Sequence, residues 1–317
     1  MGELVDVLGS GYSITTLALA ADQMATLIRY PAQINTRGAL LYVHGFADYF
    51  FQTHLAEHFA ARGFDFYAID LRRYGRSIRE GDIPYFTTDL SEYAEELDLA
   101  VEQVRADGHR RMVVLAHSTG GLIAPLWLND RRDLDSIDAL VLNSPWLELQ
   151  ENWLLRTVGT WAIRAIGRVR PEMVIPQMMD AIYSESIHRS RQGEWDFNTD
   201  WKPLSPQPVR FGFLAAVRRA HARLHRGLDL RIPVLVMHSD KSRLKLKEWT
   251  PEAMTADTVL NVEQMEQWAP VIGPNVITAT IPNGMHDLFL SAKPVRNSAF
   301  AVMDAWLGCT SMYVGVH

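Results

Sequence analysis

Short apolar runs alternate with helix-like segments through most of the chain, and this alternation is the strongest constraint on the fold. The apolar runs occupy residues 39–44, 64–70, 111–117, 138–143, 232–238 and 276–281, with helical periodicity between them. Continuous apolar strands separated by helices are typical of a parallel sheet covered on both faces. We therefore expect an α/β fold with a mostly parallel central sheet and helices on both faces, preceded by a hairpin over residues 13–30.

The alternation stops after Trp146 and resumes only with the strand at residues 232–238. The interrupting segment, residues 146–210, holds five of the nine tryptophans of the chain. We expect residues 1–145 and 211–317 to form one core domain, with residues 146–210 inserted as a helical cap or lid. Trp146 and Trp153 are the candidates for lining a substrate pocket. A second helical layer packed on the sheet is the alternative.

Composition excludes several classes of function. The net charge is −6 over 317 residues with no basic stripe, which argues against nucleic-acid binding because that affinity depends on neutralising phosphates. The single Cys309 excludes intrachain disulfides and cysteine-based zinc sites. The longest uncharged stretch, residues 112–129, carries polar residues and Pro125, so no membrane span is expected. With no signal sequence at the start, a cytoplasmic protein is expected, and transient contact with a membrane surface stays open. The oligomeric state is not encoded.

Ser118 is the strongest candidate for a reactive group. It follows the strand at residues 111–117 and opens a helix, with Ala116 and Gly120 two positions away on either side. Small residues are needed there because a nucleophile elbow holds its serine in strained backbone at a tight turn. His117 and Gly120 are thus expected to shape the site. The alternative is a serine that only caps the helix.

A serine nucleophile needs a base, and the base needs an orienting acid. With this elbow the acid and the histidine follow the serine in that order along the chain. Asp240 and His286 each come just after a predicted strand, where parallel sheets place functional loops. We predict a triad of Ser118, Asp240 and His286. Asp257 lies too far beyond the strand end in this interpretation, and Asp287 is expected to cap the following turn.

The turn after the first core strand is the candidate oxyanion hole. Gly45 follows His44 and permits a close turn, so that the backbone N–H of Phe46 can point above Ser118. The N–H of Thr119, the residue after the nucleophile, is the second expected donor.

No metal or cofactor is expected. The pattern His54-x-x-Glu57-His58 fits the spacing of some metalloproteases, but it is short and would require a distant third ligand, and its helix is explained by covering the sheet. No glycine-rich phosphate loop of the P-loop type occurs in the chain.

Taken together, these motifs resemble α/β-hydrolases of the monoacylglycerol lipase and lysophospholipase group, which is grouped with serine aminopeptidase-like hydrolases. The resemblance extends from about residue 39 to residue 307. It rests on the segments at 44–49, 70–77, 117–121 and 284–287 together with Asp240. It departs from the group's pattern at Ala116, where the elbow usually has glycine, and at the turn holding Asp240, which lacks one.

The resemblance implies an α/β-hydrolase fold with Ser118 as nucleophile, His286 as base and Asp240 as acid. It also implies a helical cap over an apolar acyl pocket and a small apolar or lipid-like ester as substrate. The expected function is a serine carboxylester hydrolase. Amide or peptide cleavage of the iminopeptidase type, thioester hydrolysis and a non-catalytic ligand-binding protein remain as alternatives.

Overall fold

The computed structural model describes residues 8–131, 134–150, 159–176 and 178–310, and its centre is one eight-stranded sheet. The strands follow the order β1-β2-β4-β3-β5-β6-β7-β8 across the sheet. Their bounds are β1 Ser13–Leu19, β2 Gln23–Tyr30, β3 Gly38–Val43, β4 Phe64–Asp70, β5 Met112–His117, β6 Ile137–Asn143, β7 Val234–Ser239 and β8 Val276–Ile281. β2 pairs antiparallel with both β1 and β4, and the other neighbours are parallel. The predicted α/β class with a mostly parallel sheet is confirmed.

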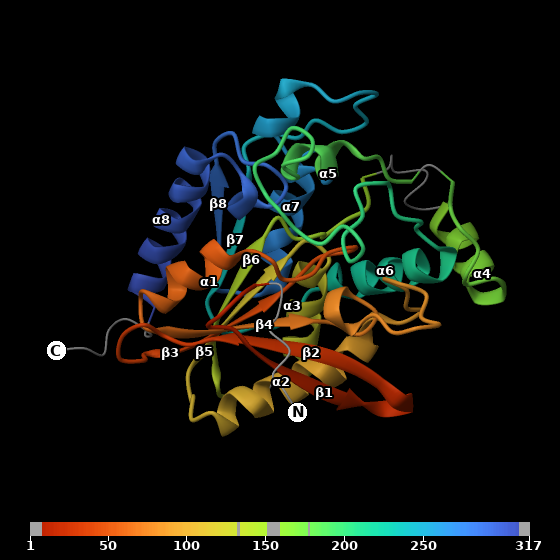
Figure 1. The fold of residues 1–317 in the computed structure, drawn as a ribbon. Helices are drawn as coiled ribbons and strands as arrows, with labels where there is room; N and C mark the ends of the chain where they lie inside the picture. The colour runs from red at the N-terminus through yellow and green to blue at the C-terminus, as the bar shows by residue number, and fades with distance from the viewer. Residues whose placement is uncertain (1–7, 132–133, 151–158, 177, 311–317) are drawn as a thin grey trace.

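Helices cover both faces of the sheet (Figure 1). Their bounds are α1 Thr53–Ala60, α2 Ala94–Ala106, α3 Gly120–Asp130, α4 Thr160–Val169, α5 Ile182–Ile187, α6 Phe211–Leu224, α7 Val262–Trp268 and α8 Lys293–Cys309. Strand side chains alternate between the faces, so Leu40 and Tyr42 pack with α1 and α8 whereas Leu41 and Val43 pack with α2 and α3. Both faces of β3 are buried, which explains its uninterrupted apolar sequence.

The chain between β6 and β7 leaves the sheet and carries α4, α5 and α6. Figure 1 shows α4 outside α6 at one edge of the molecule, and α5 above the end of the sheet where β5 to β8 finish. The tryptophan-rich segment lies within this insertion. Trp153 lies outside the described residues.

In the described part of the chain, every helix is too short or too polar to cross a bilayer.

Candidate active site

Ser118 lies in the sharp turn between β5 and α3. Its φ of 52° is in the left-handed region, which is strained for a residue with a side chain. The turn is held by the N–H of Ser118, which donates to Asn143 O at 3.1 Å, and by the N–H of Trp146, which donates to Ser118 O at 2.9 Å. These bonds fix the serine above the carboxyl end of the sheet, as a nucleophile elbow requires.

Two glycines let the neighbouring backbone approach this turn. A Cβ on Gly120 would lie 2.5 Å from His44 O and 2.7 Å from Val43 O, so only glycine lets α3 start against β3. A Cβ on Gly45 would lie 3.0 Å from the Cβ of Ser118. The expected shaping roles of Gly45 and Gly120 thus correspond to close contacts in the structure.

Three buried side chains form a continuous hydrogen-bonded chain. The Nε2 atom of His286 lies 3.0 Å from Ser118 Oγ, and its Nδ1 lies 2.8 Å from Asp257 Oδ2. Because a carboxylate only accepts, Nδ1 carries the proton and Nε2 can accept from the serine hydroxyl. Asp257 is fully buried, and its other oxygen accepts from the N–H groups of Val259 and Leu260 at 2.8 Å and 2.7 Å. The carboxylate is therefore held in one orientation.

The prediction that Asp240 orients His286 is wrong. Asp240 is exposed at the end of β7, and its Oδ1 accepts from the N–H of Asn283 at 2.7 Å. Asn283 has a φ of 60°, so Asp240 stabilises the strained turn that leads from β8 to His286. Its role is to support the histidine loop, and the carboxylate that contacts His286 is that of Asp257.

Asp257 reaches the site because the chain returns to its starting point after leaving β7. Its N–H donates to Lys241 O at 3.0 Å and its O accepts from the N–H of Arg243 at 2.8 Å. Residues 243–256 are thus an excursion whose two ends lie side by side. The number of residues between the end of β7 and Asp257 therefore did not predict how close Asp257 lies to His286. The one signal in the sequence is the polar, basic composition of residues 241–248, which indicates a surface loop that must come back before α7.

Phe46 and Thr119, whose N–H groups are the predicted oxyanion-hole donors, both line the pocket beside Ser118. Among the described residues, neither the N–H of Phe46 nor that of Thr119 donates a hydrogen bond to another protein group. His44 braces the loop that carries Phe46. Its Nε2 accepts from the N–H of Leu71 at 3.1 Å, so its Nδ1 donates to Gly45 O at 2.7 Å. Burial lowers the pKa of His44, which keeps the ring in this neutral form.

His117 is buried beside His286. Its Nδ1 lies 3.0 Å from Asn143 O, and its ring centroid is 4.8 Å from that of His286. Burial lowers the pKa of His117, so no second positive charge is held against His286. Asp287 accepts from the N–H of Phe289 at 3.0 Å, which confirms its predicted role as a turn cap.

A pocket of about 170 Å³ opens onto Ser118 and His286. Its apolar walls come from the loop after β3, from residues 146–210 and from α6: they include Phe46, Trp146, Met178, Met179, Val209 and Phe213. Trp146, a predicted pocket residue, is thus part of the pocket wall. The polar residues of the lining include the ion-paired Asp48 and Lys202.

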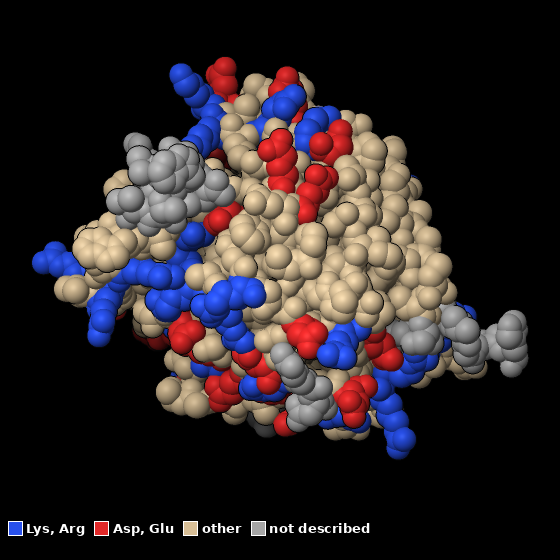
Figure 2. Space-filling model, turned by 180° about the vertical axis from the view of Figure 1, so that it is seen from behind, with Lys and Arg blue, Asp and Glu red and all other residues tan. Residues whose placement is uncertain are grey.

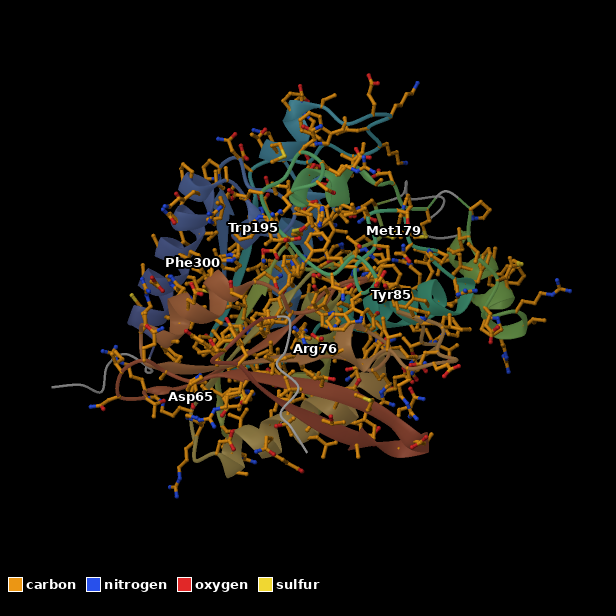
Figure 3. All side chains as sticks on the ribbon, viewed as in Figure 1. Asp65, Arg76, Tyr85, Met179, Trp195 and Phe300 are labelled. Atoms are coloured by element: carbon orange, nitrogen blue, oxygen red, sulfur yellow. The ribbon has the colours of Figure 1, made fainter. Side chains whose placement is uncertain are left out.

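The insertion is fastened to the core by aromatic contacts. Trp201 packs on the edge of Tyr49 with ring centroids 5.4 Å apart, and Trp195 stacks on His54 at 4.3 Å. The indole N–H of Trp195 also donates to Leu290 O at 2.7 Å. Figure 3 shows Trp195 on the side of the insertion near α1 and α8, and Met179 on the side toward α6. These contacts account for tryptophans that composition alone left unexplained.

The histidines of the metalloprotease-like pattern have other partners. His54 Nε2 lies 2.9 Å from Phe289 O, and His58 Nε2 lies 3.0 Å from Asp304 Oδ1. Among the described residues, no group of three or more His, Cys, Asp or Glu side chains is arranged to hold a metal ion.

Fold, elbow and pocket define an α/β-hydrolase, and comparison with known proteins gives the family. Residues 34–290 match the family model described as serine aminopeptidase, S33, and the chain belongs to this family of hydrolases. The resemblance to the monoacylglycerol lipase group, seen in the sequence, is confirmed.

Three relatives illustrate the similarity. The chain is 29% identical to a monoacylglycerol lipase of Mycolicibacterium smegmatis over 217 residues, which cover 66% of this chain and 71% of the relative. A soluble variant of monoglyceride lipase from Saccharomyces cerevisiae, solved with a substrate analog, superposes with a TM-score of 0.70 at 17% identity, covering 97% of this chain and 98% of the other. The monoacylglycerol lipase of Paleococcus ferrophilus gives a TM-score of 0.62 at 18% identity, covering 89% and 98%. At these identities the two structures support the fold.

Proposed function

We propose that the protein is a serine carboxylester hydrolase that cleaves an apolar acyl ester through a triad of Ser118, His286 and Asp257. The observation that carries this proposal is the hydrogen-bonded chain from Ser118 Oγ through His286 to Asp257, which opens on one side into an apolar pocket. The nucleophile, the base and the orienting acid have the contacts that acyl transfer needs.

The reaction follows from the placement of these atoms. Ser118 Oγ attacks the acyl carbon while its proton passes to His286 Nε2, and Asp257 holds the imidazolium. The carbonyl oxygen becomes an oxyanion beside the N–H groups of Phe46 and Thr119, which are the proposed donors. As the bond to the alcohol breaks, Nε2 returns the proton to the alcohol oxygen. Water then attacks the acyl-enzyme and gives a proton to His286 Nε2. The carboxylic acid leaves as Nε2 returns that proton to Ser118 Oγ.

The pocket supports an apolar acyl group as the substrate part next to Ser118. Trp146, Met178, Met179 and Phe213 offer no charge to the acyl chain, and Met side chains adapt to different shapes. Relatives named as monoacylglycerol lipases support a lipid-like ester. We propose in addition that residues 146–210 act as the lid of this pocket, since both methionines come from that segment.

Labelling and turnover test the proposal together. A fluorophosphonate probe should label the wild-type protein at Ser118, and Ser118→Ala should abolish both labelling and hydrolysis. A series of p-nitrophenyl esters from acetyl to palmitoyl, followed by monoacylglycerols, then ranks acyl length. Absence of labelling and of hydrolysis across the series would contradict the proposal and favour a non-catalytic ligand-binding protein.

Aminopeptidase-like cleavage is the second candidate because one acid of the segment 146–210 lines the pocket. Of the acids in the insertion, Asp180 borders the pocket, with its Oδ1 accepting from the N–H of Ile182 at 3.0 Å. Its second oxygen can receive a substrate amine. A panel of aminoacyl and prolyl amides decides this, with Asp180→Asn as the test variant. Turnover of amides that falls with Asp180→Asn, while ester turnover stays, would favour the peptidase activity.

A further inference from the structure

The outer side of α4 and α6 carries a concentration of positive charge. Figure 2 shows lysine and arginine side chains gathered at the left edge of this face, where α4 and α6 lie. A groove between the two helices is lined by five arginines: Arg164, Arg168, Arg219, Arg223 and Arg226. None of the described residues that line it is acidic. This local charge contrasts with the net charge of −6 of the whole chain.

Part of this charge is not neutralised within the protein. Arg223 is ion-paired with Asp130, and Arg164 and Arg219 donate to backbone carbonyls. Among the described residues, no acidic side chain pairs with Arg168 or Arg226, and both are exposed. These two guanidinium groups are free to bind an anion, and guanidinium binds phosphate oxygens in pairs.

Exposed apolar side chains lie beside these arginines. Trp161 is 75% exposed and Val169 is 78% exposed, at opposite ends of α4. Met173 and Val174, which follow α4 in the chain, are also exposed, with exposed fractions of 39% and 42%. Large apolar side chains exposed together beside cationic ones mark an interaction surface, and a tryptophan with arginines is typical of the boundary between water and lipid.

This surface is rigidly connected to the pocket of Ser118. α4 packs closely on α6 through Gly167, where a Cβ would lie 2.7 Å from Phe211 O and 2.9 Å from the Cβ of Ala215. α6 in turn places Phe213 in the pocket wall, on the side away from the arginines. A partner bound to the groove would therefore lie one helix away from the proposed acyl site.

We propose that the groove between α4 and α6 docks the protein on the surface of an anionic phospholipid membrane. Arg168 and Arg226 bind headgroup phosphates, while Trp161 and Val169 enter the interfacial layer. A nucleic acid would match the charge, but it would leave Val169, Met173 and Val174 in water, and lipid is the partner that covers them. Docking is independent of catalysis, so its failure would leave the proposed hydrolase activity untouched.

Vesicle co-sedimentation tests the docking. The Ser118→Ala protein is used so that hydrolysis does not consume lipid, with vesicles of phosphatidylcholine alone or mixed equally with phosphatidylglycerol. Binding to the anionic vesicles should exceed binding to the neutral ones and fall as salt rises. Arg168→Gln with Arg226→Gln should weaken partitioning onto the anionic vesicles about 25-fold, because each arginine near an anionic surface contributes about five-fold. Trp161→Ala should weaken it several-fold on both kinds of vesicle.

Matched variants elsewhere on the surface separate docking from general charge. Arg105→Gln with Arg110→Gln removes the same charge from exposed positions at the end of α2 and beyond, and should change binding less than two-fold. Ile34→Ala, at a position 53% exposed, is the control for Trp161→Ala. Equal binding of the two double variants would overturn the proposal. The proposal would also be overturned if millimolar glycerol phosphate abolished binding to vesicles, because that would indicate a site for a soluble anion. Tighter binding to single-stranded DNA than to vesicles would overturn it as well.

Discussion

Lys202 Nζ lies 2.7 Å from Asp48 Oδ1, and this ion pair joins the insertion to the loop that carries the proposed oxyanion-hole amide of Phe46. The two side chains are 7% and 4% exposed, so the pair is removed from water. Although burial opposes ionisation of Asp48, the ammonium of Lys202 lowers the pKa of that carboxyl. Tyr49 adds a second link, since its hydroxyl accepts from the N–H of Asn198 at 2.7 Å. The segment 146–210 and the loop after β3 thus hold one another in place.

Breaking this pair from one side should destabilise the protein strongly. Lys202→Met keeps the side-chain length but leaves Asp48 buried without a partner, for which we expect a loss of about 3–5 kcal/mol in the free energy of unfolding. Asp48→Asn together with Lys202→Met should recover a large part of the lost free energy of unfolding, because no charge is then left buried. Urea unfolding of the two single variants and the double variant measures the coupling. Strictly additive losses would show that the pair does not act as a unit.

Asp257 rather than Asp240 should be needed for turnover. Asp257→Asn keeps the shape but favours the wrong tautomer of His286, and an analogous substitution in a serine protease lowers kcat about 10⁴-fold. Asp240→Asn, at the exposed end of β7, should lower kcat less than about ten-fold, through the turn at Asn283 alone.

Ester hydrolysis under saturating substrate checks this pair of variants. Circular dichroism and the thermal midpoint show that each variant is folded before its rates are compared. A comparable fall in kcat in the two variants would mean that the orienting acid is a different residue or that both carboxylates are needed.

Local sequence pattern was sufficient for those parts of the site that directly follow a strand. Ser118 directly follows the buried strand β5, and His286 follows β8 after a short turn, so strand periodicity located both. Asp257 could not be located in this way, because its position depends on backbone contacts with Lys241 and Arg243 across a long excursion. Such closure is a property of the folded chain, and a loop of polar residues carries no periodicity that predicts where it ends.

The contacts between the segment 146–210 and the core could not be predicted from the sequence for the same reason. Lys202 and Asp48 are 154 positions apart, and although Asp48 lies in the motif segment 44–49, nothing in that segment predicts Lys202 as its partner. The tryptophans of the insertion marked a segment that must bury aromatic surface. Their partners, such as Tyr49 for Trp201 and His54 for Trp195, depend on how the insertion lies over the sheet.

Gly120→Ala should damage the active site more than its small size indicates. The new methyl group would meet His44 O at 2.5 Å and push α3 away from the oxyanion loop. We expect a loss of about 1–3 kcal/mol in stability and a fall in kcat of about 100-fold or more if the proposed oxyanion donors move apart. Gly308→Ala in α8, where a Cβ meets no atom within 4 Å, is the control and should be neutral or slightly stabilising. Unchanged kcat in Gly120→Ala would remove the proposed role of this contact.

His221 should make the protein sensitive to acid. Burial, and secondarily the Arg218 cation, lowers the pKa of His221 to about 3, whereas an unfolded histidine titrates near 6.5. Between these values the unfolded chain binds a proton that the folded protein does not, so the free energy of unfolding falls as pH decreases below about 6.5. At pH 5 this amounts to about 2 kcal/mol from His221 alone.

His221→Gln isolates this contribution. The ring Nε2 lies 2.8 Å from Trp146 O and Nδ1 lies 3.1 Å from Arg218, contacts that an amide can replace in part. The variant should be less stable than the wild type at pH 7.5, and this gap should narrow by about 2 kcal/mol at pH 5 because the glutamine does not titrate. Urea unfolding of both proteins at the two pH values gives the comparison. A gap that stays constant would mean that His221 accepts a proton in the folded protein, in spite of its burial behind the strand-end loop that carries Trp146.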